Sequence, residues 1–289
     1  MVKFSIVTPI KDEKHFIPRT LPSHYEVNPS EVVLCFDKPA PKDTLKVAKK
    51  VIKAYNAEEI TKIIEVERNP EWAFHQANVR RTGFKEATYD RILTTDIDLI
   101  INRNILKAVN MVGKEDVGLV SCGKFRYPNN LVGFWRAMGY NVLRKSFVFL
   151  KKFQTGGLKM SAFTGLYALY RPYWLDSEDE EGIKRFVNPK QVFRGETIPE
   201  GGVLWHAGED TYLRDCMMKQ HRVITLSDIG AVCLTDALED APDIQFEIGR
   251  YNATRARSML GAIVHVVAYG HPHYFRGFIY EKQKATKSA

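Results

Sequence analysis

Short apolar runs alternate with stretches of helical spacing through the first hundred residues of the chain. The apolar runs are rich in β-branched residues, which predicts strands. Between them, 43–56 has apolar positions at helical spacing after Asp43 as N-cap, and 70–87 reads as a helix with Gly83 near a bend or end. A polar stretch with prolines follows the first strand. The predicted strands are 3–10, 31–37, 61–68 and 90–98.

Strands and helices that alternate at this spacing predict an α/β fold, a mostly parallel sheet with helices on both faces. The second half of the chain is less regular. Its acidic stretch at 176–182 reads as a solvated loop, to which we assign no function. The other expected elements are a strand at 116–125, a small-residue turn between strand-like runs at 160–174, a helix within 204–220 and a strand pair at 221–236.

Aspartates lie at the ends of several predicted strands. Asp96 and Asp98 close the fourth strand, so alternation would turn both to one face and Ile97 into the packing. Two carboxylates so placed repel each other unless a cation is near, and a divalent cation with a phosphate-bearing ligand is one candidate. The alternative is a strand-end turn with solvated aspartates. Asp12 and Asp37 end other strands, at the edge where such sheets bind ligands.

Composition narrows the class of protein. Charged residues make up 26% of the chain and hydrophobic residues 45%, as in ordinary globular proteins. The four cysteines show no CxxC pairing, which favours buried free thiols in a reducing compartment. We read the N-terminus as a first strand and not a signal peptide, and no apolar window is long enough to span a membrane.

The net charge of +8 favours an anionic partner, which could be nucleic acid, anionic lipid or a phosphorylated small molecule. Zinc-finger, RNP and basic-zipper motifs are absent from the sequence, so we expect no nucleic-acid partner.

The order of several segments resembles that of a family 2 glycosyltransferase with the GT-A fold. The segments are SIVTPIKDE, VVLCFD, NVRRTGFKEATYDRILTTDID, FTGLYALYR and GEDTYLRD, and they span roughly residues 3–230. The resemblance implies a Rossmann-like sheet in one GT-A-like domain over 1–289. We expect a nucleotide-sugar-binding half at 1–100, an acceptor and catalytic half at 101–235, and a helical, aromatic C-terminal extension at 236–289.

The resemblance also implies how a nucleotide-sugar donor is held. Mn²⁺ or Mg²⁺ would stabilise the departing diphosphate, with Asp98 as direct ligand and Asp96 holding ribose or metal-bound water. Asp37 would bind base or ribose. Arg80 or Arg81 would reach diphosphate or base, although both read equally well as a solvated helix face. The nucleoside pocket would be lined near Pro9, Ile10 and Asp12.

The GED segment carries the other half of the implied chemistry. Asp210 would be the base that takes the proton from the acceptor hydroxyl, with Glu209 orienting acceptor or base. Such a base needs a raised pKa, which adjacent, partly buried acids can produce. The alternative is two acids that stabilise a helix N-terminus. Thr164 and Gly165 would let the backbone approach the acceptor sugar, or Gly165 would simply serve a strand turn.

A third metal or phosphate contact often comes from the C-terminal region in GT-A enzymes. His273 is the candidate ligand, with His271 as its neighbour across Pro272, and a surface or core histidine is the alternative. His206, three residues before Glu209, has the same two readings. The arginines that could replace a histidine are Arg250, Arg255 and Arg257. The sequence lacks the Q-x-x-R-W segment of polymerising synthases, which argues against a processive enzyme.

We predict a metal-dependent, inverting glycosyltransferase of the hexosyltransferase type, acting on an acceptor hydroxyl or lipid phosphate in the cytoplasm. Aromatic and basic residues at 131–153 and 259–280 would suit peripheral contact with the inner membrane face, or would pack as core or stack on a sugar. The alternatives are a non-catalytic nucleotide-sugar-binding protein and a sugar-phosphate nucleotidyltransferase. TPIKDEKHF lacks the glycines that the latter needs.

Overall fold

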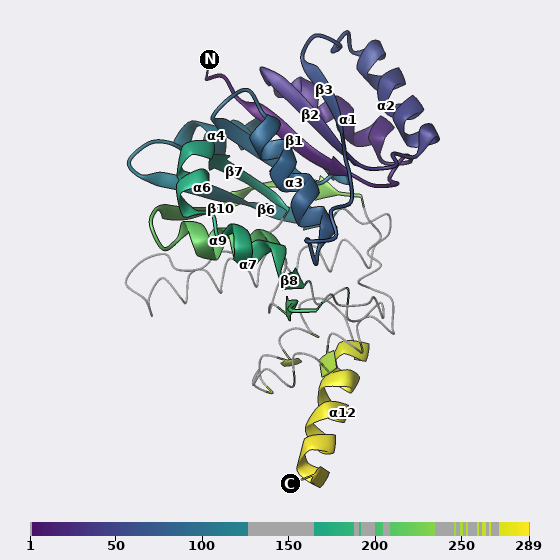
Figure 1. Ribbon diagram of the computed structural model, residues 1–289, viewed down its shortest axis with the longest axis vertical. Coiled ribbons are helices and arrows are strands. Elements are labelled where there is room, and N and C mark those ends of the chain that lie inside the picture. The colour runs from purple at the N-terminus through teal and green to yellow at the C-terminus, as the bar shows by residue number, and fades with distance from the viewer. Residues whose placement is uncertain are drawn as a thin grey trace.

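A central sheet dominates the computed structural model (Figure 1). The structure describes residues 2–126, 165–187, 191, 200–204, 209–234, 246, 249–250, 253, 259, 262–263, 266 and 272–288. Among them, eight strands form the sheet in the order β3-β2-β1-β4-β7-β6-β10-β5. They are β1 (Ser5–Ile10), β2 (Glu31–Asp37), β3 (Thr61–Val66), β4 (Arg91–Thr95), β5 (Leu99–Ile100), β6 (Val117–Arg126), β7 (Leu166–Tyr170) and β10 (Arg222–Cys233).

The sheet is mostly parallel, as the sequence predicts. β1 runs parallel to β2 and β4, β2 to β3, and β6 to β10. β7 is antiparallel to both of its neighbours, β4 and β6, and β5 is antiparallel to β10. β8 (Phe186–Val187) and β9 (Val203–Leu204) form a separate parallel pair.

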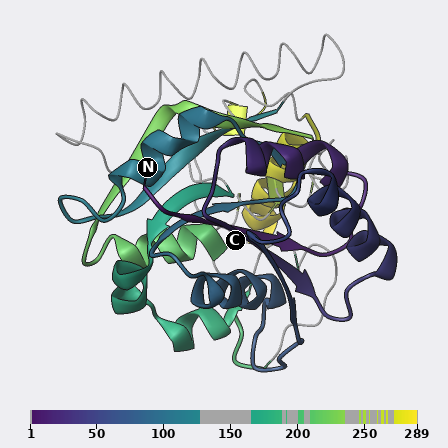
Figure 2. The same cartoon turned by 90° about the horizontal axis from the view of Figure 1, so that it is seen from above.

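Helices cover both faces of the sheet, which confirms the predicted fold class. One core cluster joins the sheet to α1 (Ile17–Glu26), α2 (Lys42–Ala54) and α4 (Leu106–Met111). The opposite cluster joins it to α3 (His75–Glu86), α6 (Arg171–Ser177) and α9 (Glu209–Met217). Figure 2 shows the two groups of helices on opposite sides of the strands.

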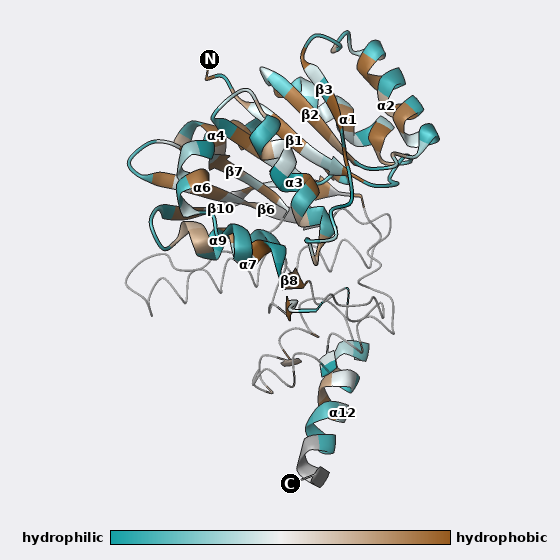
Figure 3. Cartoon of the chain, in the orientation of Figure 1, coloured by the Kyte–Doolittle hydropathy of each residue, from teal (hydrophilic) through white to brown (hydrophobic). Residues whose placement is uncertain are grey.

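Alternation along the strands explains why both faces are apolar. In β2, Val32, Leu34 and Phe36 belong to one cluster, whereas Val33 and Cys35 belong to the other, and all are fully buried. Figure 3 shows hydrophobic strands and helices whose outer faces are hydrophilic. Burial of each large apolar side chain contributes about 1.5–3 kcal/mol, so a strand buried on both faces is held from both sides.

α1 was not predicted, because its prolines read as a loop. Pro18 occupies the first turn, where its missing N–H costs nothing, and Pro22 lies inside the helix. Its own residues Ile17 and Leu21 are fully buried in the core. Ser23 Oγ accepts a hydrogen bond of 3.1 Å from the Ile101 amide, which ties α1 to the segment after β5.

Several predicted boundaries also move. Gly83 lies inside α3 and not at its end, and a Cβ there would be 2.5 Å from both Cys35 Sγ and Val7 Cγ1. Glycine at this position therefore allows α3 to approach the sheet closely. The predicted strand pair at 221–236 is one strand, β10, with a register shift between Leu226 and Gly230. The segment 131–153 lies outside the described residues.

The C-terminal region forms a small core of its own around α12 (Pro272–Ser288), whose fully buried side chains include Tyr274 and Phe278. These aromatics thus pack as core, one of the two predicted readings for 259–280. No described helix is long and apolar enough to cross a membrane. Cys35, Cys122 and Cys216 are buried free thiols, as predicted.

Candidate active site

The carboxyl ends of β1, β2 and β4 meet at one edge of the sheet, and the predicted donor-site aspartates follow them. Asp12 is exposed and accepts a 3.3 Å hydrogen bond from Thr44 Oγ1. The Asp37 side chain is 29% exposed, and its Oδ1 lies 2.8 Å from Nε2 of His75. His75, which begins α3 beside the end of β2, was not predicted as a partner of Asp37.

The Asp96–Asp98 segment differs from the prediction in detail. β4 ends at Thr95, so the two aspartates lie in a turn closed by a 3.1 Å hydrogen bond from the Leu99 amide to the Asp96 carbonyl. Ile97 is 2% exposed and packs in the core, as expected. Asp96 and Asp98 are both partly exposed. The Asp98 carbonyl accepts from the Leu234 amide at 2.8 Å, which fixes the turn against the end of β10.

Arg80 on α3 lies behind this turn, and its side chain is only 5% exposed. Its Nη2 donates to Asp96 Oδ1 at 2.8 Å and to Glu209 Oε1 at 3.4 Å. Its Nη1 donates to Thr94 Oγ1 at 3.1 Å. The predicted alternative of a solvated helix face is therefore wrong for Arg80, whose guanidinium contacts Asp96 and Glu209. Its predicted contact with diphosphate or base stays a prediction.

Glu209 and Asp210 form the first turn of α9, the position that both predicted readings require. The Glu209 side chain is 13% exposed. Burial, followed by the charge of Glu209, raises the pKa of Asp210 to about 7, while Arg80 opposes that rise. Tyr167 from β7 is fully buried beside these groups, and burial raises the pKa of its hydroxyl. A carboxyl with a pKa near neutrality is suited to exchange a proton at physiological pH.

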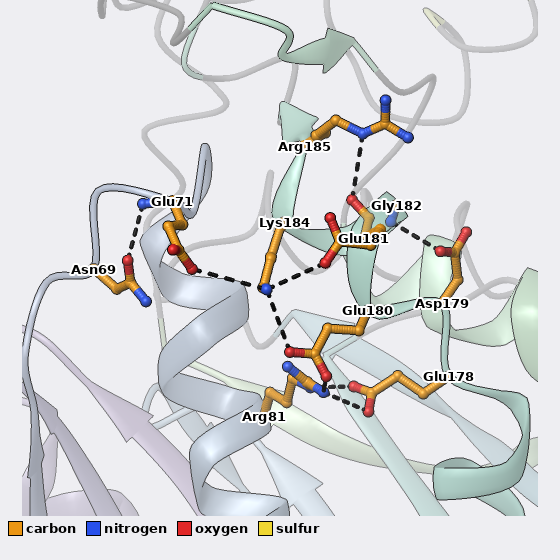
Figure 4. A network of polar contacts seen from close by, with 10 residues as sticks. All are labelled: Asn69, Glu71, Arg81, Glu178, Asp179, Glu180, Glu181, Gly182, Lys184 and Arg185. Atoms are coloured by element: carbon orange, nitrogen blue, oxygen red, sulfur yellow. Dashed lines mark hydrogen bonds and ion pairs between the residues drawn. The ribbon is translucent and has the colours of Figure 1, made fainter.

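Arg81, the next residue along α3, belongs to a different network (Figure 4). Its side chain is 9% exposed and contacts Glu178 through two nitrogens, with Nη2 also 2.7 Å from Glu180 Oε2. Its guanidinium lies 5.4 Å from the centre of the Trp72 ring. Arg81 is therefore neither solvated nor directed at the predicted donor site.

The acidic stretch at 176–182 is only in part the solvated loop that the sequence predicts, because the Asp176 and Glu181 side chains are 67% and 76% exposed whereas Glu178 is not. α7 (Glu180–Lys184) begins within it, and the Glu178 side chain is only 12% exposed, paired with Arg81. Lys184 joins Glu180, Glu181 and Glu71, which ties α7 to the loop before α3 (Figure 4). On the other side, Tyr212 of α9 donates a 2.6 Å hydrogen bond to Asp179. This segment therefore links the loop before α3 to α9, the helix that carries Asp210.

Gly165, from the predicted acceptor turn, lies against the turn that holds Asp96 and Asp98, the predicted donor turn. Its carbonyl accepts from the Asp96 amide at 3.2 Å, and a Cβ at Gly165 would lie 2.0 Å from Asp96 Oδ2. Any larger residue at this position would require that carboxylate to move. Thr164 lies outside the described residues. Pro9 and Ile10 are buried in β1.

The two described candidates from the C-terminal region, Arg250 and His273, do not join this cluster. Arg250 pairs with Glu281 at 2.8 Å, within the C-terminal core. His273 lies in the first turn of α12, and the part of the chain that the structure describes holds no group of three or more His, Cys, Asp or Glu residues that could bind a metal. His273 is therefore not brought to Asp96 and Asp98 as a third ligand. The remaining candidates, His206, His271, Arg255 and Arg257, lie outside the described residues.

The family model for glycosyl transferase family 2 matches residues 5–177. The mannosyltransferase PcManGT from Pyrobaculum calidifontis, solved with GDP-Man and Mn²⁺, shares the fold. Its TM-score is 0.55 and its identity 18%, over 99% of this chain and 76% of that one.

A structure of S. aureus TarS 1–349 matches 96% of this chain and 71% of its own, with 14% identity and a TM-score of 0.49. No curated protein matches the sequence. The family model covers more than half of the chain. The chain therefore belongs to glycosyl transferase family 2.

Proposed function

We propose that the protein is a metal-dependent hexosyltransferase. It moves a sugar, with inversion, from a nucleoside-diphosphate sugar to an acceptor hydroxyl or lipid phosphate. The observation that carries the proposal is the meeting of the two implied half-sites at Arg80, which contacts donor-side Asp96 and base-side Glu209.

The donor set suits a hard divalent cation. Asp96 and Asp98 offer carboxylate oxygens from one turn, and Mg²⁺ is commonly held by one or two carboxylates together with substrate phosphates. A bound cation would act as a Lewis acid for the charge that develops on the leaving diphosphate. Asp98 would be the direct ligand. The Mn²⁺ and GDP-Man in PcManGT, which has the same fold, support a metal and a nucleotide sugar here.

Asp210 is the proposed base. As the acceptor oxygen bonds to the anomeric carbon and the carbon–phosphate-oxygen bond breaks, the hydroxyl proton passes to the Asp210 carboxylate. A pKa of about 7 supports this role, because a useful fraction of the carboxylate is ionised at neutral pH and its proton affinity is well above that of an ordinary aspartate. Arg80 holds the neighbouring Glu209, which orients the pair.

A thermal-shift panel tests the donor site. UDP, GDP, dTDP, ADP and CMP are each added with Mn²⁺, Mg²⁺ or EDTA, and a nucleotide at about 100 times its Kd should add about 2.7 kcal/mol of stability. We expect a metal-dependent shift with one nucleotide, lost in Asp98→Asn. Asp90→Asn is the control, because Asp90 precedes β4 at its other end and pairs with Arg171.

The panel is followed by sugar transfer from the donor that carries the selected nucleotide. Release of nucleoside diphosphate that depends on an added acceptor supports an enzyme. Binding without any turnover would instead support the non-catalytic nucleotide-sugar-binding protein. Absence of any shift in the wild type would remove the donor site and the proposal with it.

A further inference from the structure

Arg80 contacts acids from two elements far apart in the sequence. One nitrogen, Nη2, donates to both Asp96, in the turn after β4, and Glu209, in the first turn of α9. The two distances differ, 2.8 Å to Asp96 and 3.4 Å to Glu209, so the donor-side acid is the closer partner. The other terminal nitrogen is anchored on Thr94. The guanidinium is therefore held in place and shared between the two sides of the site.

Burial strengthens the interactions of Arg80 with the two acids that share it. The Arg80 side chain is 5% exposed, and charge interactions are much stronger in such surroundings than at a screened surface. When one acid of a shared pair loses its charge, the other keeps more of the cation's attraction. Arg81 provides the contrast on the same helix, since its partners Glu178 and Glu180 lie outside the donor–base cluster.

We propose that Arg80 is a positioning residue that couples binding at the donor turn to the acids of α9. The inference rests on the proposed function, because it assumes that Asp96 belongs to a donor site. Glu209 does not touch the donor in this scheme, and it changes donor affinity through Arg80. Such coupling is reciprocal, so donor binding would equally change how firmly Glu209 is held beside Asp210.

The direction of the effect follows from the charges. Glu209→Gln removes the more distant hydrogen-bonded acid and leaves Asp96 as the carboxylate that Nη2 contacts, with Asp210 as a further charge nearby. A cation bound at this carboxylate then competes with a stronger internal partner. Nucleotide binding in the presence of metal should weaken by about fivefold or more.

The test is a double-mutant cycle on affinity. Titration calorimetry gives the Kd of UDP and of GDP, each with Mn²⁺, for wild type, Glu209→Gln, Arg80→Lys and the double variant. A lysine has one ammonium and cannot hold Thr94, Asp96 and Glu209 together. We expect Glu209→Gln to weaken binding at least about fivefold in the wild type but less than about twofold in the Arg80→Lys background.

Glu178→Gln is the matched control, because it makes the same change beside Arg81 and should leave Kd unaltered. An unchanged Kd in Glu209→Gln overturns the inference, even if Arg80→Lys does not fold. Equal losses in both backgrounds would mean direct contact between Glu209 and the donor, which overturns it as well. If neither nucleotide binds the wild type, the proposed function itself fails.

Discussion

The acids at the proposed donor edge of the sheet are solvent-accessible, whereas those on α9, which carries the proposed base, are largely buried. At the edge, Asp12 is exposed and Asp37 is 29% exposed, with few protein partners. On α9, Glu209 is 13% exposed, and burial raises the pKa of its neighbour Asp210. Accessible oxygens suit ligand binding, whereas a buried acid pair suits proton transfer. The difference teaches that the two halves of the site are built by different means, with Arg80 between them.

The largest expected effect comes from Asp210→Asn on the buried side. An amide cannot accept the acceptor proton, so kcat should fall about 10²–10⁴-fold while donor affinity is kept. Initial-rate assays of sugar transfer measure kcat for the wild type and the variant. Asp215→Asn on the same helix is the control, since Asp215 pairs with Arg214. A full transfer rate in Asp210→Asn would refute the assignment of the base.

Asp210 also gives a pH dependence. Its pKa is raised from 3.8 to about 7 in the fold, so the folded chain binds more protons than the unfolded chain between these values. Stability from this group is present below pH 3.8 and is lost as pH rises through about 7. Asp210→Asn should therefore be more stable than the wild type at pH 8, by up to about 4 kcal/mol in urea unfolding. The wild-type transfer rate should rise with pH through about 7.

Arg81→Gln breaks the buried network that links α3 to the α7 segment. Glu178 would keep a buried charge without its cation, which should lower the free energy of unfolding by about 3–5 kcal/mol. Urea denaturation gives the value. Lys62→Gln is the surface control, because its pair with Glu86 is 43% and 48% exposed and is worth at most about 1 kcal/mol. Similar losses in both variants would mean that burial does not distinguish the pairs.

His24→Leu probes the helix beneath the donor turn. His24 is fully buried near the Leu99 backbone, and burial lowers its pKa from 6.5 to about 4. The unfolded chain gains a proton at pH values where the folded chain does not, so stability falls as pH falls from 6.5 towards 4. The wild type should lose about 2 kcal/mol from this group at pH 5, and the variant should not. Exposed His15→Gln should behave as the wild type.

Gly165→Ala should have the smallest effect, confined to the donor turn. The new Cβ would lie 2.0 Å from Asp96 Oδ2, so the carboxylate must move. Overpacking of this kind is unfavourable. We expect nucleotide affinity by calorimetry to fall roughly tenfold, which corresponds to about 1.4 kcal/mol. Gly83→Ala clashes with Cys35 and Val7 in the core, so it should lower stability and leave the affinity of the folded protein unchanged.

Local pattern was enough to predict much of the fold. Alternating apolar runs gave strands such as 31–37, which matches β2, and helical spacing at 43–56 nearly matches α2. The order of motifs indicated the family. α1 was missed because Pro18 and Pro22 look like loop residues until the core beneath them is known.

The partners of charged residues could not be predicted in this way. Arg81 and Glu178 are 97 positions apart, and no periodicity links them. Glu178 was therefore predicted to be solvated, and Arg81 either to contact the donor or to be solvated. The same holds for Arg80, whose contact with Glu209 spans 129 positions. These pairs arise only when β7 and α9 are placed beside α3, which is a property of the topology.

The position of β7 limits how this chain could be recombined. β7 comes from residues 166–170 yet lies between β4 and β6, and the end of β10 holds the Asp98 carbonyl. A cut near residue 100 would leave β4 with an open edge and the donor turn without its brace. A chimera that exchanges donor specificity with another glycosyltransferase must therefore carry the N-terminal strands, β7 and β10 together as one interlocked unit.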